Sequence, residues 1–340
     1  MSGKGIRVVV TGATGNLGTS VVDALADDSG VDSVLGIARR AAECSRLKLR
    51  YASADLAEIP EGALDALLTG ADVVIHLAWM FQPTRDPAVT WRTNVVGSIR
   101  LYEAVARCGV PAAVHSSSVG AYSPGPKDSA VGEDWPTHGW PTAAYTVEKP
   151  YLERYLDGFE LAHPEVRVVR LRPAFVFKRE SASQQRRLFA GPLLPTALVR
   201  RSFIPVVPDL PGLRVQAVHS RDVGAAFRLA ARNPVRGAFN VAADPVIDAH
   251  TLAELLEART VRVPAWPVRK ALSAAWHAHV VPASPGLLDA VLRLPLMDTT
   301  RARTELGWQP AHTATEAVAE FLTGLRERAG LPTAPLAPAG

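Results

Sequence analysis

A tyrosine and a lysine four residues apart, Tyr145 and Lys149, are the first side chains in the sequence that could carry out chemistry. Residues at this spacing share one face of a helix, so the lysine ammonium can lie near the phenol. The pKa of a tyrosine is ordinarily about 10, and a nearby positive charge lowers it. Serines at 116–118 end an apolar run, and one of them could hold a substrate oxygen while Tyr145 exchanges a proton with it. This set predicts acid–base chemistry at a hydroxyl or carbonyl group.

Three glycines spaced three residues apart follow a β-branched run and open a helical pattern. In a dinucleotide-binding turn the first glycine permits the tight turn, the second lets a pyrophosphate approach the backbone, and the third lets the helix pack on the strand. The N-terminus of the helix offers N–H groups to the phosphates. In this turn we therefore expect cofactor contacts from Gly12, Thr14, Gly15, Asn16, Leu17 and Gly18.

The second predicted strand ends in Arg39 and Arg40, and the next acidic residue is Glu43. A carboxylate at the end of this strand binds the ribose hydroxyls of NAD, whereas arginines pair with the 2′-phosphate of NADP. We therefore predict NADP as the cofactor, with NAD as the alternative.

Strand-like and helical patterns alternate over the first half of the chain. Strands are expected at 6–10, 34–37, 72–77, 110–115 and 166–171, and helices at 63–68, 94–108 and 145–161. Such alternation predicts an α/β fold with a Rossmann-type, doubly wound parallel sheet. Ser118 would then lie at the carboxyl edge of the sheet, where ligands bind in such folds.

Prolines and tryptophans become frequent in the second half, which indicates a change of organisation. We expect residues 1–173, with returning segments near 214–243, to form an NAD(P)-binding domain. Residues 174–213 and 244–330 are expected to form a smaller C-terminal substrate-binding region. Residues 331–340 hold three prolines and no periodic pattern, which predicts a disordered tail.

Taken together, these motifs resemble the extended short-chain dehydrogenase/reductase (SDR) group, the NAD-dependent epimerase/dehydratase family. The resemblance covers almost the whole chain and is carried by the glycine turn, Asp55–Leu56, His76–Ala78, Asn94–Ser98, Ser116–Tyr122, Arg172–Phe177, His219–Val223 and Glu305–Trp308. It implies an oxidoreductase that transfers hydride at a nicotinamide with Ser118, Tyr145 and Lys149 as the catalytic residues. It also implies cofactor contacts from Asp55, Leu56, Leu77, Ala78, Tyr145 and Lys149.

Three functions stay open. The first is an NAD(P)-dependent oxidoreductase acting on a carbonyl or alcohol, the second a nucleotide-sugar epimerase, and the third a non-catalytic NADP-binding sensor. Phe177–Lys178 and Val215 depart from the pattern of the sugar-nucleotide enzymes, and Ser118–Gly120 lacks the acid and base of the dehydratases. Residues 79–81 (Trp-Met-Phe) follow a predicted strand and either line a pocket for an apolar substrate or pack in the core.

Composition narrows the class of protein. The chain has 340 residues, of which 48% are hydrophobic and 21% charged, and it contains no run of about 18 apolar residues that could cross a membrane. The net charge of +4 comes from scattered arginines and argues against nucleic acid as a partner. Cys44 and Cys108 are the only cysteines, so a cytoplasmic protein without a disulfide framework is expected. We expect a small-molecule substrate and consider a homodimer; His277 and His279 lack an acidic partner, so no metal is expected.

Overall fold

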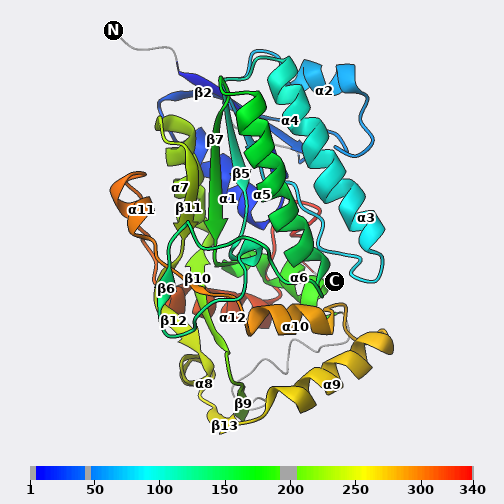
Figure 1. Ribbon diagram of the computed structural model, residues 1–340, viewed down its shortest axis with the longest axis vertical. Coiled ribbons are helices and arrows are strands. Elements are labelled where there is room, and N and C mark those ends of the chain that lie inside the picture. Colours follow the sequence, from blue (N-terminus) through cyan, green and yellow to red (C-terminus); the bar gives the residue numbers. More distant parts are fainter. Residues whose placement is uncertain (1–4, 43–46, 192–204, 339–340) are drawn as a thin grey trace.

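The computed structural model describes residues 5–42, 47–191 and 205–338; Glu43, Cys44 and residues 339–340 lie outside them. The main layer is a seven-stranded sheet of order β11-β7-β5-β4-β1-β2-β3, in which all neighbouring strands are parallel (Figure 1). Its strands are β1 (Ile6–Thr11), β2 (Val31–Ala38), β3 (Leu49–Ser53), β4 (Val73–His76), β5 (Ala112–Ser116), β7 (Arg167–Pro173) and β11 (Gly237–Val241). The expected Rossmann-type sheet is confirmed. Strands β3 and β11 were not expected from the sequence pattern.

Helices cover both faces of this sheet. One face is packed by α1 (Asn16–Ala26) and α7 (Ser220–Arg232), and the other by α2 (Glu61–Leu68), α4 (Gly97–Arg107) and α5 (Ala144–Ala162). The side chains of Val8 and Val10 pack in the core on the first face, and that of Val9 packs in the core on the second, because successive side chains of a strand point to opposite faces. Because both faces are covered, the strands are nearly continuous apolar runs.

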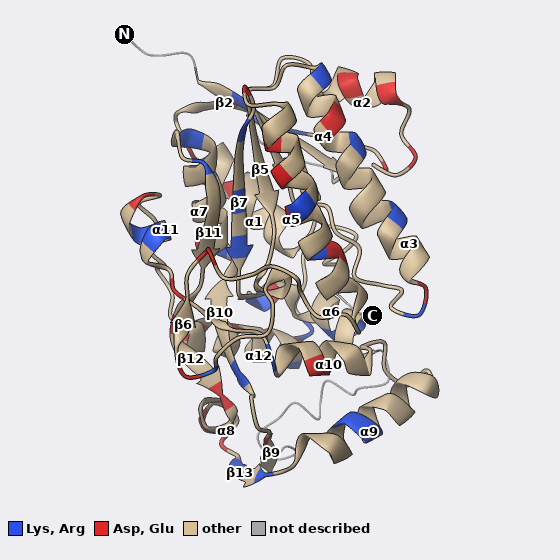
Figure 2. Ribbon diagram, viewed as in Figure 1, with Lys and Arg blue, Asp and Glu red and all other residues tan. Residues whose placement is uncertain are grey.

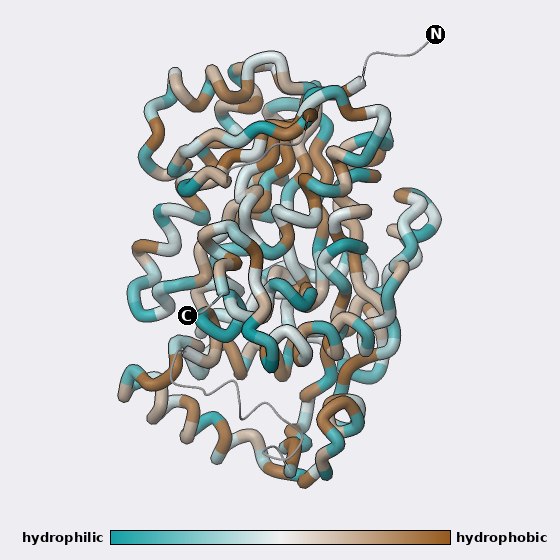
Figure 3. The backbone as a smooth tube through the Cα atoms, turned by 180° about the vertical axis from the view of Figure 1, so that it is seen from behind, coloured by the Kyte–Doolittle hydropathy of each residue, from teal (hydrophilic) through white to brown (hydrophobic). Residues whose placement is uncertain are grey.

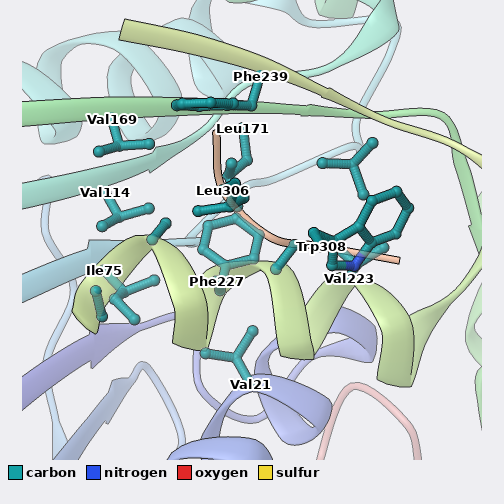
Figure 4. Close-up of a cluster of buried hydrophobic side chains, with 14 of the residues drawn as sticks. Val21, Ile75, Val114, Val169, Leu171, Val223, Phe227, Phe239, Leu306 and Trp308 are labelled. Carbon is teal, nitrogen blue, oxygen red and sulfur yellow. The ribbon is translucent and has the colours of Figure 1, made fainter. Parts of the chain in front are cut away.

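The core on the α1 and α7 side is built around large buried side chains (Figure 4). Phe227 on α7 and Trp308, from the segment after α11 (Thr300–Thr304), are fully buried there. The indole N–H of Trp308 donates to the backbone carbonyl of Asp222 at 2.8 Å. The C-terminal part of the chain is therefore fastened to the face of the main sheet.

A smaller region, whose segments alternate in sequence with the last strands of the main sheet, lies beyond the carboxyl edge of that sheet (Figure 1). It contains a three-stranded sheet of order β12-β10-β8 and two pairs, β13 with β9 and β14 with β6. The strands are β6 (Ala130–Val131), β8 (Phe175–Phe177), β9 (Val206–Asp209), β10 (Arg214–His219), β12 (Ala243–Asp248), β13 (Arg259–Arg262) and β14 (Leu296–Met297). The returning segment near 214–243 divides between the regions, because β10 joins the small sheet whereas α7 and β11 complete the main one.

Short and medium helices fill the rest of the chain: α3 (Pro87–Trp91), α6 (Ala182–Gln185), α8 (Ala249–Leu256), α9 (Ala265–His277), α10 (Pro285–Val291) and α12 (Ala314–Glu327). Helix α9 mixes hydrophobic and hydrophilic residues along its length (lower left of Figure 3). Lysines and arginines are scattered over the elements of both regions (Figure 2). Within the described residues, no helix combines the length and apolarity that a membrane span requires.

Residues 331–338 differ from the expected disordered tail, because they form a compact turn against the main domain. The Leu331 N–H donates to the Leu336 carbonyl at 2.9 Å, and the Leu336 side chain is fully buried. The hydroxyl of Thr333 donates to the backbone carbonyl of Thr14, in the glycine turn, at 2.9 Å. One buried leucine and a few hydrogen bonds hold this segment in place. Such contacts produce no periodic sequence pattern, so the sequence does not predict them.

Candidate active site

The candidate active site is a cavity of about 1060 Å³ at the carboxyl edge of the main sheet. One half is walled by the turns after β1, β2, β4 and β5 and by the first turns of α5, and the other by residues 186–190, α9 and α10. The structure brings every expected site residue to this cavity: Gly12, Thr14, Gly15, Asn16, Leu17, Gly18, Arg39, Arg40, Asp55, Leu56, Leu77, Ala78, Ser118, Tyr145 and Lys149. Their individual roles stay predictions.

The glycine turn has the shape that a dinucleotide phosphate needs. Gly12 has a φ of +71°, and a Cβ there would lie 2.6 Å from the backbone nitrogen of Ala78. A Cβ on Gly18 would lie 2.1 Å from the Gly12 carbonyl oxygen, so only glycine allows α1 to pack this closely. Helix α1 begins at Asn16 without a side-chain cap, which leaves its first N–H groups available to an anion. These residues fit a bound NAD(P).

The expected adenosine end of the site is built from the ends of β2 and β3. Arg39 and Arg40 follow β2, are exposed and lie on the rim of the cavity. The Ser53 hydroxyl donates to the Arg39 carbonyl at 2.8 Å and holds that backbone. Asp55 accepts the Ala57 N–H at 3.0 Å, and Leu56 is buried beneath it. Two exposed arginines therefore line this end of the cavity, and the choice between NADP and NAD stays a prediction.

Tyr145 and Lys149 lie on successive turns at the start of α5. Burial raises the pKa of Tyr145 to about 12, and a hydrogen bond with Ser118 acts against that rise. The Ser118 Oγ also accepts the Gly120 N–H at 3.0 Å. Burial lowers the pKa of Lys149 to about 7, although the charges of two glutamates raise it. Burial therefore disfavours the charged forms of both groups, the Tyr145 phenolate and the Lys149 ammonium.

The Lys149 ammonium is directed away from the phenol. It donates to the Ser116 carbonyl at 2.7 Å and lies 3.4 Å from the centroid of the Trp79 ring, but 5.8 Å from that of Tyr145. Burial raises the pKa of Tyr145 in this structure, so the predicted lowering of that pKa by Lys149 is not observed.

Trp79, Met80 and Phe81 form an apolar wall that lines the cavity beside Tyr145. The Phe81 ring stacks on Tyr145 with 4.5 Å between centroids and meets Phe189 edge-on at 5.4 Å. Of the two alternatives left open for these residues, the structure places them in the lining. Phe175, Leu287 and Leu288 extend the apolar surface through the substrate half of the cavity.

The sequence analysis did not identify Glu148 as a site residue, nor did it predict that Asn94 bonds the backbone beside the cavity. Both residues are buried. The Asn94 amide accepts the Met80 N–H at 2.7 Å and donates to the Met80 carbonyl at 2.8 Å. The same amide nitrogen donates to the Glu148 carboxylate at 2.7 Å. A glutamate between Tyr145 and Lys149 was the available signal, because a carboxylate placed there needs buried partners.

Phe177, which departs from the sugar-nucleotide pattern, lines the cavity, whereas three basic side chains that could bind a diphosphate form hydrogen bonds within the protein. The Arg214 guanidinium donates to the Lys127 carbonyl at 2.6 Å. Lys178 is buried, its ammonium donates to Thr19 Oγ1 at 2.6 Å, and burial lowers its pKa to about 8. Arg187 lines the cavity, but its guanidinium donates to two carbonyls of the 331–338 turn.

A histidine pair outside the cavity has potential metal ligands. Ligand atoms of His219, His312 and Glu320 lie within 4.8 Å of one another. The His219 Nδ1 accepts the Arg221 N–H at 3.2 Å, so its Nε2 carries the proton that faces Glu320. The two rings stack at 4.1 Å, and His312 Nδ1 is held by Asp222. Hydrogen bonds account for this group, and the expectation of no metal stays a prediction.

The comparison with protein families agrees with this geometry. A family model described as "NAD dependent epimerase/dehydratase family" matches residues 8–242. The chain belongs to this family. The resemblance seen in the sequence motifs is thereby confirmed, and an NAD(P) dinucleotide is the cofactor class of the family.

Similar proteins of known sequence fall into two groups. The chain is 29% identical over 341 residues to a UDP-glucose 4-epimerase of Mycolicibacterium smegmatis, covering 95% of this chain and 99% of that one. It is 27% identical over 328 residues to an uncharacterized protein of Mycobacterium tuberculosis, covering 96% of this chain. The chain spans only 31% of the length of that protein, as it does for the other first relatives it matches.

Solved structures of NAD-dependent epimerase/dehydratase enzymes share the fold. MoeE5 in complex with UDP-glucose and NAD superposes with a TM-score of 0.69 and 24% identity, over 94% of this chain and 99% of that one. UDP-glucose 4-epimerase of Thermotoga maritima with UDP-glucose gives a TM-score of 0.69 and 21% identity, over 95% and 99%. At these identities the likeness establishes the α/β architecture and its smaller C-terminal sheets.

Proposed function

We propose that the protein is an NAD(P)-dependent enzyme that transfers hydride to or from a carbon bearing a hydroxyl or carbonyl group. The observation that carries this proposal is the convergence of the uncapped α1 turn, Tyr145, Lys149 and Ser118 on one cavity. A sensor needs the dinucleotide turn but has no use for a buried phenol beside a buried ammonium, which disfavours the third function considered.

In the direction of reduction, Tyr145 donates its proton to the substrate oxygen, and in oxidation it accepts that proton. Ser118 orients the oxygen through its hydroxyl. Lys149 would hold a ribose hydroxyl of the nicotinamide half through an ammonium hydrogen that faces neither the Ser116 carbonyl nor the Trp79 ring. The nicotinamide, when bound, supplies or accepts the hydride.

We further propose that NADP(H) is preferred to NAD(H). Arg39 and Arg40 on the cavity rim support this preference, although MoeE5 was solved with NAD. Calorimetric titration of both cofactors tests it, with Arg39→Ala/Arg40→Ala as the variant. We expect tighter binding of NADP and a loss of that advantage in the variant; tighter binding of NAD to the unmodified protein would contradict the proposal.

For the substrate, we propose a largely apolar or aromatic carbonyl compound. The apolar side chains of Phe81, Phe175, Phe189 and α10 support it, since a pocket of this kind favours apolar groups. A nucleotide sugar is the second candidate. It is favoured by the likeness to UDP-glucose 4-epimerase and to MoeE5, whose structure holds UDP-glucose.

One experiment separates the two candidates. The purified protein is incubated with reduced and oxidised cofactor and either a panel of aryl and alkyl ketones and alcohols or UDP- and dTDP-sugars. Net oxidation of the nicotinamide with a ketone supports the first candidate. Conversion of a UDP-sugar to its epimer without net change of the nicotinamide supports the second and rejects the first.

A further inference from the structure

Lys149 is a buried ammonium whose charge is in direct contact with an aromatic ring. It is almost fully buried, with 3% exposure. Its Nζ lies 3.4 Å from the centroid of Trp79, within the distance of a strong cation–π contact. Among the described residues, no carboxylate forms an ion pair with it. The ring of Trp79 therefore stands where a buried lysine ordinarily has an acidic partner.

None of the other titratable groups around Lys149 among the described residues makes a direct charge contact with its ammonium. Burial lowers the pKa of His76 on β4 to about 3 and the pKa of His115 on β5 well below its ordinary value, so both are neutral. Glu148 and Glu153 on α5 favour the ammonium only through longer-range charge, and the remaining neighbour is the Tyr145 phenol. A carboxylate in direct contact would fix the ammonium and cancel its charge, whereas a ring leaves that charge effective.

A chain of hydrogen bonds fixes the position of the ring. The carboxylate of Glu148 accepts the Thr90 hydroxyl at 2.6 Å and the Asn94 amide at 2.7 Å. Asn94 in turn pairs with both backbone groups of Met80, the residue next to Trp79. The Trp79 ring also meets Tyr145 edge-on at 5.7 Å. The Glu148 carboxylate and the Asn94 amide are both hydrogen-bonded, so Met80 cannot shift without breaking a buried bond, although the indole N–H of Trp79 has no partner among the described residues.

We propose that Trp79 is a positioning residue that acts through Lys149, holding the ammonium under its ring face while the Glu148–Asn94 pair holds Trp79. The inference rests on the proposed function, because it explains how a buried lysine, without an ion pair among the described residues, keeps part of its charge near Tyr145. The free face of the ammonium is then left for a ribose hydroxyl. Trp79 contributes charge stabilisation without competing for the hydrogen bonds that the cofactor needs.

The test measures the ionisation of Lys149 in the cofactor-free protein by its rate of acylation with acetic anhydride across pH, followed by mass spectrometry. In Trp79→Leu the midpoint should move downward by roughly 0.4–1.5 pH units, the size of a cation–π contact. Trp79→Phe, which keeps a ring, should retain most of the original midpoint. Trp79→Met is a second ring-free variant in case the leucine variant does not fold. Trp91→Leu is the matched control, since Trp91 packs on Tyr151 and should leave the midpoint unchanged.

A second measurement follows the reaction. The alkaline limit of kcat/KM, where Lys149 loses its proton, should shift downward in Trp79→Leu by a similar amount and recover in Trp79→Phe. An unchanged acylation midpoint in both ring-free variants overturns the proposal. Equal shifts in the leucine and phenylalanine variants also overturn it, because they would show a packing role alone. Absence of turnover with every substrate would reject the proposed function, while the acylation midpoint would still decide the role of Trp79.

Discussion

Helix α5 carries two buried sets of ionisable side chains one turn apart, and the protein treats them in opposite ways. The first set is Tyr145 with Lys149, which have no ion pair and whose pKa values are moved by burial to about 12 and about 7. The second is Glu153, which is fully buried and accepts hydrogen bonds from Arg172 at 2.9 Å and 3.0 Å and from Arg170 at 3.2 Å. Burial by itself raises the pKa of Glu153, but these arginines lower it to about 2.

The contrast shows where the chain uses charge for stability and where it uses charge for chemistry. A buried carboxylate with bidentate arginine partners is satisfied and inert. A buried phenol and ammonium without such partners sit close to a change of protonation, which is the property that acid–base catalysis requires. The Glu153 cluster fastens α5 to β7, and thereby holds Tyr145 and Lys149 at the edge of the sheet.

Removing the phenol oxygen should give the largest effect on activity. Tyr145→Phe keeps the ring that packs on Phe81 but removes the proton donor, so the rate of hydride transfer should fall by about 10²–10⁴-fold. Single-turnover kinetics measures this rate, and cofactor affinity should barely change. A near-normal rate in the variant would show that another group handles the proton.

Removing the satisfied carboxylate should instead destabilise the fold. Glu153→Ala leaves the buried guanidinium groups of Arg170 and Arg172 without this partner, so the free energy of unfolding should fall by about 3–5 kcal/mol. Urea unfolding measures the change. Asp157→Ala is the matched control, since this carboxylate also pairs with Arg170 but is half exposed, and it should cost about 1 kcal/mol or less. Similar losses in the two variants would remove the distinction drawn here.

The pH dependence of stability should reveal Lys149. Burial lowers its pKa to about 7, against about 10.4 in an unfolded chain. Between these values the unfolded state binds more protons, so the free energy of unfolding rises as pH increases. Relative to Lys149→Met, the unmodified protein should gain at most about 4 kcal/mol between roughly pH 6 and pH 10. A flat difference across this window would mean that the lysine is not desolvated in solution.

The smallest and sharpest test uses two adjacent serines. Ser117 Oγ donates to Glu153 at 2.5 Å, whereas Ser118 is hydrogen-bonded to Tyr145. Ser117→Ala should lower the free energy of unfolding by about 1–2 kcal/mol and leave the rate of hydride transfer unchanged. Ser118→Ala should lower the rate, by less than Tyr145→Phe does, and should also lower the free energy of unfolding by about 1–2 kcal/mol, because the Gly120 N–H loses its acceptor. The reverse pattern would exchange the roles of the two serines.

Much of the cofactor half follows from the sequence, because its signals are local. The steric need for glycine at Gly12 and Gly18 is a property of a few consecutive residues. The spacing of Tyr145 and Lys149 follows from helical geometry, and the apolar runs that form β1 and β4 follow from burial on both faces. These patterns predict that the candidate catalytic side chains lie at one edge of the sheet, without any knowledge of distant contacts.

What the sequence leaves open depends on residues far apart in the chain. Three consecutive serines look alike, and only the packing of β5 against α5 gives Ser117 to Glu153 and Ser118 to Tyr145. The contact between Trp79 and Lys149 joins residues 70 positions apart in the sequence, so no local sequence pattern predicts it. Leu336 is buried by surroundings that its own proline-rich segment does not reveal. Sequence by itself determined which groups could do chemistry; the tertiary structure decided which are neutralised and which stay reactive, because desolvation and pairing are set by all the neighbours at once.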